Sequence, residues 1–131
     1  MKALSVLHPG GSRIASGEKT IEVRGWAPDL ADGEDLVIVE NHQHLRHDGD
    51  EDLNGRIVAI VKVRAVRPFI TADMASSCAL VYEDGKLAWE LTDIRTVRPP
   101  RGPVIAKRGM YDLDMSLEEI LSPCRGLRRT A

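Results

Sequence analysis

Residues 16–24 constrain the fold of this chain more than any other segment. This segment carries three charged side chains separated by apolar ones: Lys19, Glu22 and Arg24. Polar and apolar residues alternate over residues 20–24, which is the pattern of a strand with one buried face. We therefore predict a strand that turns Ile21 and Val23 toward the core and its polar residues, Thr20 included, toward the opposite face.

The position of Lys19 requires a bend in the chain. In a straight strand its side chain has the wrong parity to join Glu22 and Arg24, so the backbone must turn after Gly17. If the three charges line a cleft, each loses water and must be compensated by the others, because an unpaired buried charge is costly. Glu22 should then lie within hydrogen-bonding reach of Lys19 or Arg24. The alternative is a solvated strand face that carries an exposed ion pair, which gives the same pattern.

The rest of the chain contains short apolar segments separated by Pro, Gly and Asp, which predict a mainly β (α+β) fold. Further strands are expected at residues 2–6, 36–39, 56–66, 87–97, 104–106 and 110–113. Short helices are expected at residues 13–16, with Ser12 as the cap, and at residues 71–79 and 116–121, while residues 99–103 should form an extended loop. Several short strands with three small helices predict a small β-barrel, closed or nearly closed, with peripheral helices.

The length of 131 residues fits one domain, which we expect to span residues 1–121 and to be followed by a basic tail at residues 122–131. No apolar run is long enough to cross a membrane, and Pro9 interrupts the N-terminal segment too early for a signal sequence. Two cysteines do not make a disulfide framework. We therefore expect a cytoplasmic protein with reduced thiols and no membrane partner.

Charge is distributed unevenly along the chain although the net charge is only −2. Residues 29–52 hold nine acidic side chains and one basic one, a local balance of −8. Residues 95–131 hold eight basic and four acidic side chains, a local balance of +4. This asymmetry permits a basic face that attracts phosphates, although solubility alone accounts for it equally well.

The spacing Gly17-x-Lys19-x-x-Glu22-x-Arg24 resembles the G-x-K-x-x-E-x-R signature of the ASCH domain family. Three other segments are similar to this family in the same order: the opening strand at 1–6, a late strand at 87–91 and a closing Gly-aromatic segment at 106–111. The resemblance covers roughly residues 1–113. One segment departs from it, because His8-Pro9-Gly10-Gly11 stands where family members often carry Gln-Pro-aromatic-Ala.

This resemblance implies a PUA-like β-barrel whose cleft binds RNA or a nucleotide-like ligand. Catalytic residues would be Lys19 and Glu22. Ligand-binding residues would be Arg24, Thr20, Trp26, Lys107 and Arg108. Arginine and lysine would hold phosphate, Trp26 would stack on a base, and Glu22 would accept hydrogen bonds from a base or ribose edge. No cofactor is expected.

Some relatives in the family hydrolyse acylated cytidine-type nucleosides, and others cleave RNA, which gives an alternative function. Lys19 would then be the catalytic base. The threonine found three residues after that lysine in the amidohydrolases is Glu22 here, so the catalytic set is incomplete. A module that binds another protein is a third possibility, and the sequence does not predict the oligomeric state.

A histidine-rich segment is the remaining candidate for chemistry. It contains His42, His44 and His47 with Asp48, Asp50 and Glu51. Imidazole and carboxylate groups bind zinc and similar ions, but this spacing fits no defined metal motif. A solvated loop explains the same composition, so no metal site is predicted.

Overall fold

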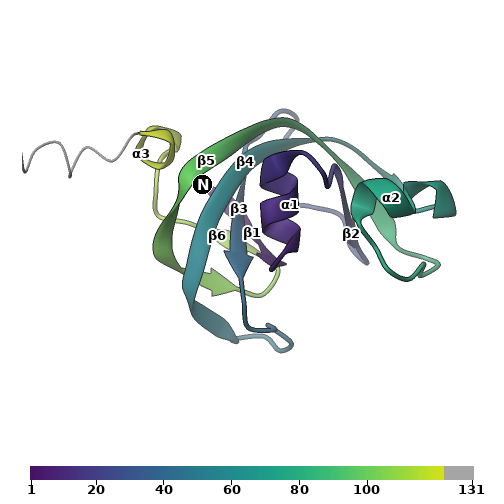
Figure 1. The fold of residues 1–131 in the computed structure, drawn as a ribbon, viewed down its shortest axis with the longest axis horizontal. Helices are drawn as coiled ribbons and strands as arrows, with labels where there is room; N and C mark the ends of the chain where they lie inside the picture. Colours follow the sequence, from purple (N-terminus) through teal and green to yellow (C-terminus); the bar gives the residue numbers. More distant parts are fainter. Residues whose placement is uncertain (123–131) are drawn as a thin grey trace, which may run out of the picture.

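The computed structural model describes residues 1–122, which form one six-stranded sheet with small helices around it (Figure 1). The strands are β1 (Lys2–Leu7), β2 (Ile21–Arg24), β3 (Leu36–Asn41), β4 (Glu51–Pro68), β5 (Leu87–Lys107) and β6 (Met110–Asp112). The helices are α1 (Gly10–Ser16), the 3₁₀ helix η1 (Thr71–Asp73), α2 (Met74–Ser77) and α3 (Leu117–Leu121). The strand order is β2-β5-β4-β3-β1-β6, so the fold is mainly β as expected.

Strands β1 and β3 pair in parallel, whereas all other neighbouring strands of the sheet pair antiparallel. Val6 lies opposite Glu40, and Leu7 lies opposite Asn41. The amide of His8 then continues the ladder by donating to the carbonyl of Asn41 at 2.7 Å. The segments that follow β1 and β3 therefore leave the sheet side by side, at the C-terminal ends of the two strands.

Strands β4 and β5 run side by side as long curved ribbons that arch over the rest of the sheet (Figure 1). The prediction of a loop at residues 99–103 is wrong, because these residues lie inside β5. Strand β2 pairs with Leu87–Glu90 of β5, and within residues 1–122 the later part of β5 has one unpaired edge. Proline is tolerated on such an edge because it removes no ladder hydrogen bond there. Five register shifts between β4 and β5 contribute to this curvature.

A closed barrel is not confirmed. In residues 1–122, β2 and β6 each pair with one strand, so they form the two edges of an open sheet. The side chain of Arg24 links the β2 edge to β1 through a hydrogen bond to the carbonyl of Ser5, without any strand pairing between them in residues 1–122. The domain is therefore a curved open sheet rather than a closed cylinder.

The core lies on both faces of the parallel pair because every residue of β3 is buried. One cluster joins Leu4, Leu36 and Ile38 to Ile14 of α1 and to Trp89. The cluster on the other face joins Ala3, Val37 and Val39 to Ile120 of α3. Alternating β-branched and small side chains fill these layers, which explains how a chain with few aromatic residues makes a core.

The helices differ from prediction in two places. Helix α1 begins at Gly10, so Ser12 lies inside it and binds Glu40 instead of acting as the cap. The helix expected at residues 71–79 is a 3₁₀ turn followed by one turn of α-helix. The start of α3 is confirmed: the Ser116 hydroxyl accepts from the Glu119 amide at 3.1 Å, and the Ser116 amide donates to the Glu119 carboxylate.

The proposed basic tail, apart from Ser122, lies outside the described residues. None of the helices within residues 1–122 has the length and apolarity required to cross a membrane.

Candidate functional site

Gly17 directs Lys19 into the protein. It ends α1 with φ of 84°, a left-handed conformation that glycine adopts without a steric penalty, and its amide bonds to the Ile14 carbonyl. The Lys19 amide then donates to the carbonyl of Arg13, so the chain doubles back over the helix end. This is the bend that the sequence required, and it leaves Lys19 only 8% exposed.

Glu22 is the centre of a buried ion cluster at the start of β2. Its carboxylate lies 3.2 Å from the Lys19 ammonium and 2.8 Å from Arg24 Nε. The predicted contact between Glu22 and these cations is therefore present. The buried cluster contradicts a solvated strand face, since Glu22 is only 5% exposed.

The Lys19 ammonium has a complete set of acceptors. It donates to the carbonyls of Ile21 at 2.9 Å and Ser77 at 2.7 Å, besides its contact with Glu22. Three partners match the three N–H donors of a lysine. These contacts tie β2 to the end of α2, so Lys19 has a clear structural role in this arrangement.

Arg24 connects the ion cluster to the molecular surface. Its guanidinium bonds Glu22 on one side and donates from Nη2 to the Ser5 carbonyl at 2.8 Å on the other. The same group lies 5.8 Å from the centre of the Trp26 ring, in a cation–π arrangement. Trp26 is held in turn by Trp89, whose indole N–H donates to the Trp26 carbonyl and whose ring meets the Trp26 ring edge-on at 5.1 Å.

Two adjoining hollows meet at Arg24, Trp26 and Arg108, and we call them together the cleft. One has a volume of about 510 Å³ and is also lined by Ser5, Asn41 and His44. The other has a volume of about 460 Å³ and is also lined by Phe69, Val81 and Lys86. Trp26 is 39% exposed, so its ring is accessible between the two hollows.

The segment between β3 and β4 is fixed by buried Asp52 and supplies one wall of the cleft. Asp52 accepts bonds from the amides of His42, Gln43 and Asn54. Burial works against ionisation of Asp52, but these amide bonds outweigh it and lower the pKa. The segment then places Asp48 against Arg108 at 2.8 Å, in an exposed ion pair of modest strength.

Asn41 places a buried acceptor in the cleft wall. Its Nδ2 donates to the Gln43 carbonyl at 2.6 Å, whereas its Oδ1 is buried with no hydrogen-bond partner among residues 1–122. Buried polar atoms in proteins usually have a partner. This atom is a candidate acceptor for a ligand N–H group.

The structure separates the predicted site residues into two groups. Arg24, Trp26 and Arg108 line the cleft. Lys19, Glu22 and Thr20 do not line it: the first two are buried, and Thr20 uses its backbone to bond Ser76 and Leu91. Lys107 does not line the cleft but an adjoining hollow, which it shares with Tyr111 and Arg108. The catalytic roles of Lys19 and Glu22 stay predictions.

Sequence reasoning missed Ser5, Asn41 and His44 as lining residues. Ser5 and Asn41 come from β1 and β3, and only the parallel pairing of these strands brings them together. Asn41 does carry a signal in the sequence, because it is an amide at the end of a continuous apolar strand. The pairing partner could not be read from that signal.

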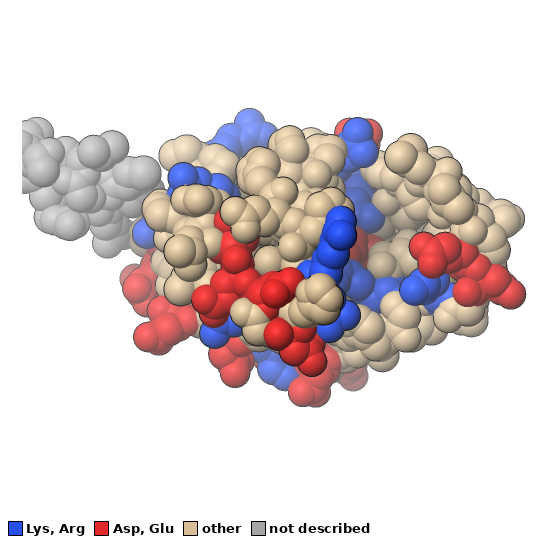
Figure 2. Space-filling view, turned by 90° about the horizontal axis from the view of Figure 1, so that it is seen from below, with Lys and Arg blue, Asp and Glu red and all other residues tan. Residues whose placement is uncertain are grey.

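Charges of both signs share the face seen in Figure 2. Acidic side chains gather on part of this face, and basic ones lie beside them without forming a continuous basic surface. Several arginines are paired with carboxylates, among them Arg64 with Glu90 and Arg67 with Asp73. Attraction for phosphate on this face would therefore be local rather than spread over it.

The predicted histidine-rich set is not brought together. Within residues 1–122, one group of at least three His, Cys, Asp or Glu side chains could hold a metal ion, and it consists of His8, Glu40 and His42. His47 instead lies near Asp50, and His44 lines the cleft. The sequence pattern groups His42 with residues of its own loop, and it does not include His8 or Glu40.

A curved open sheet with small helices around it and a cleft beside Trp26 defines this protein as a small, mainly β domain. The ASCH domain profile matches residues 4–101, so the chain belongs to the ASCH domain family, which has a PUA-like fold. A comparison with curated proteins gives no match.

Solved structures of an ASCH protein from Zymomonas mobilis share the fold. A single-residue variant of that protein matches with a TM-score of 0.59 and 16% identity, over 98% of this chain and 94% of that one. The unsubstituted protein matches with a TM-score of 0.51 and 19% identity, over 76% of this chain and 71% of that one. At this identity the similarity defines the fold and no more.

Proposed function

We propose that this ASCH-domain protein binds RNA or a nucleotide-like ligand in the cleft. The observation that carries the proposal is the convergence of two cations and one exposed aromatic ring, Arg24, Arg108 and Trp26, where the two hollows meet. Base rings stack on such aromatic side chains, and arginine binds phosphate through a planar fork of donors. A cytoplasmic location, expected from the cysteine content, is part of the same proposal.

Each lining group has a role in this proposal. Trp26 stacks on a base because its ring is pre-oriented by Trp89. Arg108 receives phosphate by exchanging its exposed contact with Asp48. Arg24 adds positive charge without moving, since Glu22 and Ser5 hold its guanidinium. The Asn41 Oδ1 atom favours a ligand with an amino group, provided that the ligand shifts the neighbouring side chains enough to reach it.

Hydrolysis of an acylated nucleoside, or of RNA, with Lys19 as the base is less well supported. Its ammonium has three partners, and it does not line the cleft. A base must reach the proton that it removes, at about 3 Å or through one water. We therefore propose binding as the principal function.

Electrophoretic titration of short single-stranded RNA at two salt concentrations tests the proposal. We expect affinity to fall with salt, and Trp26→Ala to weaken binding about 5- to 100-fold, as loss of one base stack does. Arg108→Ala should weaken binding and lower the salt slope by about 1. The matched control is Arg64→Ala, an exposed arginine on β4 that is paired with Glu90. Equal effects of Arg64→Ala and Arg108→Ala, or full affinity in Trp26→Ala, would contradict the site.

A further inference from the structure

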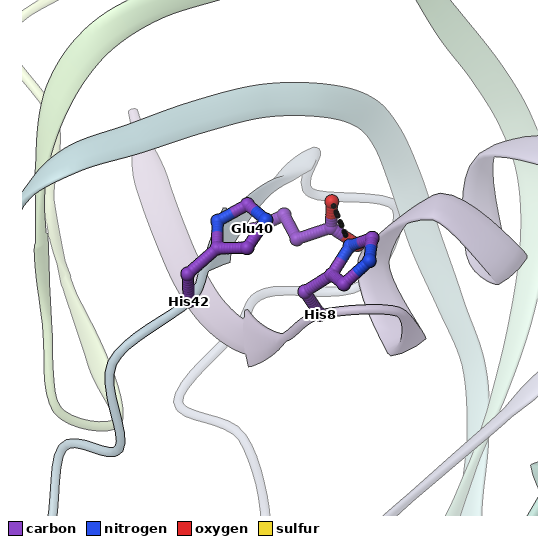
Figure 3. A group of neighbouring side chains, drawn as sticks. All are labelled: His8, Glu40 and His42. Atoms are coloured by element: carbon purple, nitrogen blue, oxygen red, sulfur yellow. Dashed lines mark hydrogen bonds and ion pairs between the residues drawn. The ribbon is translucent and has the colours of Figure 1, made fainter.

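Residues at the ends of the two parallel strands form a second cluster, distinct from the cleft. His8 follows β1, and Glu40 and His42 lie at and just beyond the end of β3. Figure 3 shows their side chains directed toward one another, with His8 bonded to Glu40. Successive side chains of a strand point to opposite faces of the sheet. Asn41 lines the cleft, so its neighbour Glu40 lies on the other face.

We propose that His8, Glu40 and His42 bind a divalent transition-metal ion of the Zn²⁺ type. One ligand atom from each residue lies within 4.8 Å of the others. Two imidazoles and one carboxylate are a ligand set that suits zinc and its neighbours in the first transition row. Three protein ligands leave at least one coordination position for water or another molecule.

The distance between His8 and Glu40 fits a shared ion. Nδ1 of His8 lies 3.1 Å from Oε1 of Glu40. Nitrogen and oxygen ligands lie ~2.1 Å from a zinc ion. Two such atoms are about 3 Å apart when the angle between them at the ion is near 95°. The ion would therefore replace the hydrogen that now joins these two atoms, with little movement of either side chain.

His42 needs one adjustment. Its ring stacks on the His8 ring, with centres 4.6 Å apart and planes 22° apart, so the in-plane lone pairs of the two rings do not meet at one point. The side chain is exposed, and it can rotate about its χ angles to aim a nitrogen at the ion. Its backbone stays in place because the His42 amide is bonded to Asp52 at 2.9 Å.

Glu40 is held ready to act as an anionic ligand. Its carboxylate accepts hydrogen bonds from the Ser12 amide at 2.6 Å and from the Ser12 hydroxyl at 2.8 Å, which fix its orientation beside His8. Gly11 makes this possible, since a Cβ atom there would lie 2.8 Å from Cβ of Glu40. The segment His8-Pro9-Gly10-Gly11, which departs from the family pattern, thus supplies both a ligand and the space beside Glu40.

Metal titration of the full chain after removal of bound ions with a chelator tests this site. Binding of Co²⁺, followed by its visible absorption, and of Zn²⁺, followed by calorimetry, should show one site per chain. We expect His8→Ala and His42→Ala each to weaken binding at least tenfold. Both side chains are exposed, so circular dichroism should show these variants folded. His47→Ala is the matched control, because it removes an exposed imidazole from the same loop.

Glu40→Gln, which keeps the size of the side chain, should weaken binding by a similar factor in protein that remains folded. The proposal is overturned if no stoichiometric binding occurs, or if His8→Ala and His42→Ala bind as tightly as the parent. It is also overturned if His47→Ala loses as much affinity as they do. Should Glu40→Gln fail to fold, the two histidine variants still decide the question.

Discussion

The guanidinium of Arg24 donates a 2.8 Å hydrogen bond to the backbone carbonyl of Ser5, although the two residues belong to strands at different places in the sheet. Strand β2 is an edge, and β1 lies next to the opposite edge. The bond thus links β2 to β1 across the open side of the curved sheet, where the two strands do not pair. It requires a donor that also satisfies Glu22, and a planar guanidinium meets both acceptors at once.

Arg24→Lys tests this bridge. Lysine keeps the charge but cannot direct fixed donors to both acceptors, so we expect a loss of about 1–2 kcal/mol in the free energy of unfolding by urea. Arg13→Lys is the control, because Arg13 lies 3.8 Å from Glu18 in an exposed pair, and it should change stability by less than about 0.5 kcal/mol. If the two substitutions are equivalent, Arg24 acts only as a charge.

Glu22→Gln should destabilise the protein by about 2–4 kcal/mol, since it leaves two cations next to each other in a buried site. Urea or thermal denaturation measures this loss. The internal comparison is Glu18→Gln, whose side chain is 62% exposed and which should cost less than about 0.5 kcal/mol. Small and equal effects at both positions would show that the buried cluster contributes little to folding.

Gly17→Ala should cost about 1 kcal/mol of stability, because alanine must adopt the left-handed conformation at the end of α1. No heavy atom lies within 4 Å of the added Cβ, so the cost is conformational and not steric. Thermal denaturation beside Gly25→Ala provides the comparison. An alanine at position 25 meets only Lys86, at 3.6 Å, with no positive φ, and it should be close to neutral. A larger loss in Gly25→Ala would refute the backbone explanation.

Asp73 gives the protein a pH-dependent contribution to stability. Its hydrogen bonds from Arg67, at 2.8 and 2.9 Å, hold its pKa below the ordinary value of 3.8. A carboxyl whose folded-state pKa is lowered adds stability above its unfolded-state pKa, and this stability is lost as pH falls through the folded-state value. The difference in unfolding free energy between the parent and Asp73→Asn should thus be constant from pH 7 to about 5 and shrink at lower pH.

Urea denaturation at a series of pH values measures that difference. Asp32→Asn, at an exposed position in the turn between β2 and β3, serves as the control for removing a surface carboxylate. A gap between parent and Asp73→Asn that grows as the solution is acidified would contradict the sign of the effect.

The local patterns predicted the strands well because hydrophobic alternation reports burial directly. The strand at residues 21–24 and the buried strand at 36–41 lie close to where the sequence placed them. The motif also predicted the contact of Glu22 with its cations, since buried charges need partners. The long β5 was missed because proline usually ends a strand, and the unpaired edge that tolerates it depends on the lengths of β2 and β4.

The candidate sites depended more on tertiary pairing than on local pattern. Trp26 and Arg108 are 82 residues apart in the sequence, and the folding of the sheet brings them together at one cleft. His8 and Glu40 meet because β1 and β3 are parallel, a relationship that single-strand periodicity does not encode. Burial of Lys19 away from the cleft could not be predicted either, because its acceptor Ser77 comes from α2.

Trp26 offers an optical test of where the ligand binds. It is 39% exposed, whereas Trp89 is fully buried, so a base stacked in the cleft should quench mainly the emission of Trp26. We expect short single-stranded RNA to quench the parent protein. Trp26→Phe keeps an aromatic ring, so it should retain binding by electrophoresis within about tenfold while most of the quenching disappears. Quenching of the same size in Trp26→Phe would place the ligand away from the cleft, because the buried Trp89 ring would then be responding to a change elsewhere in the protein.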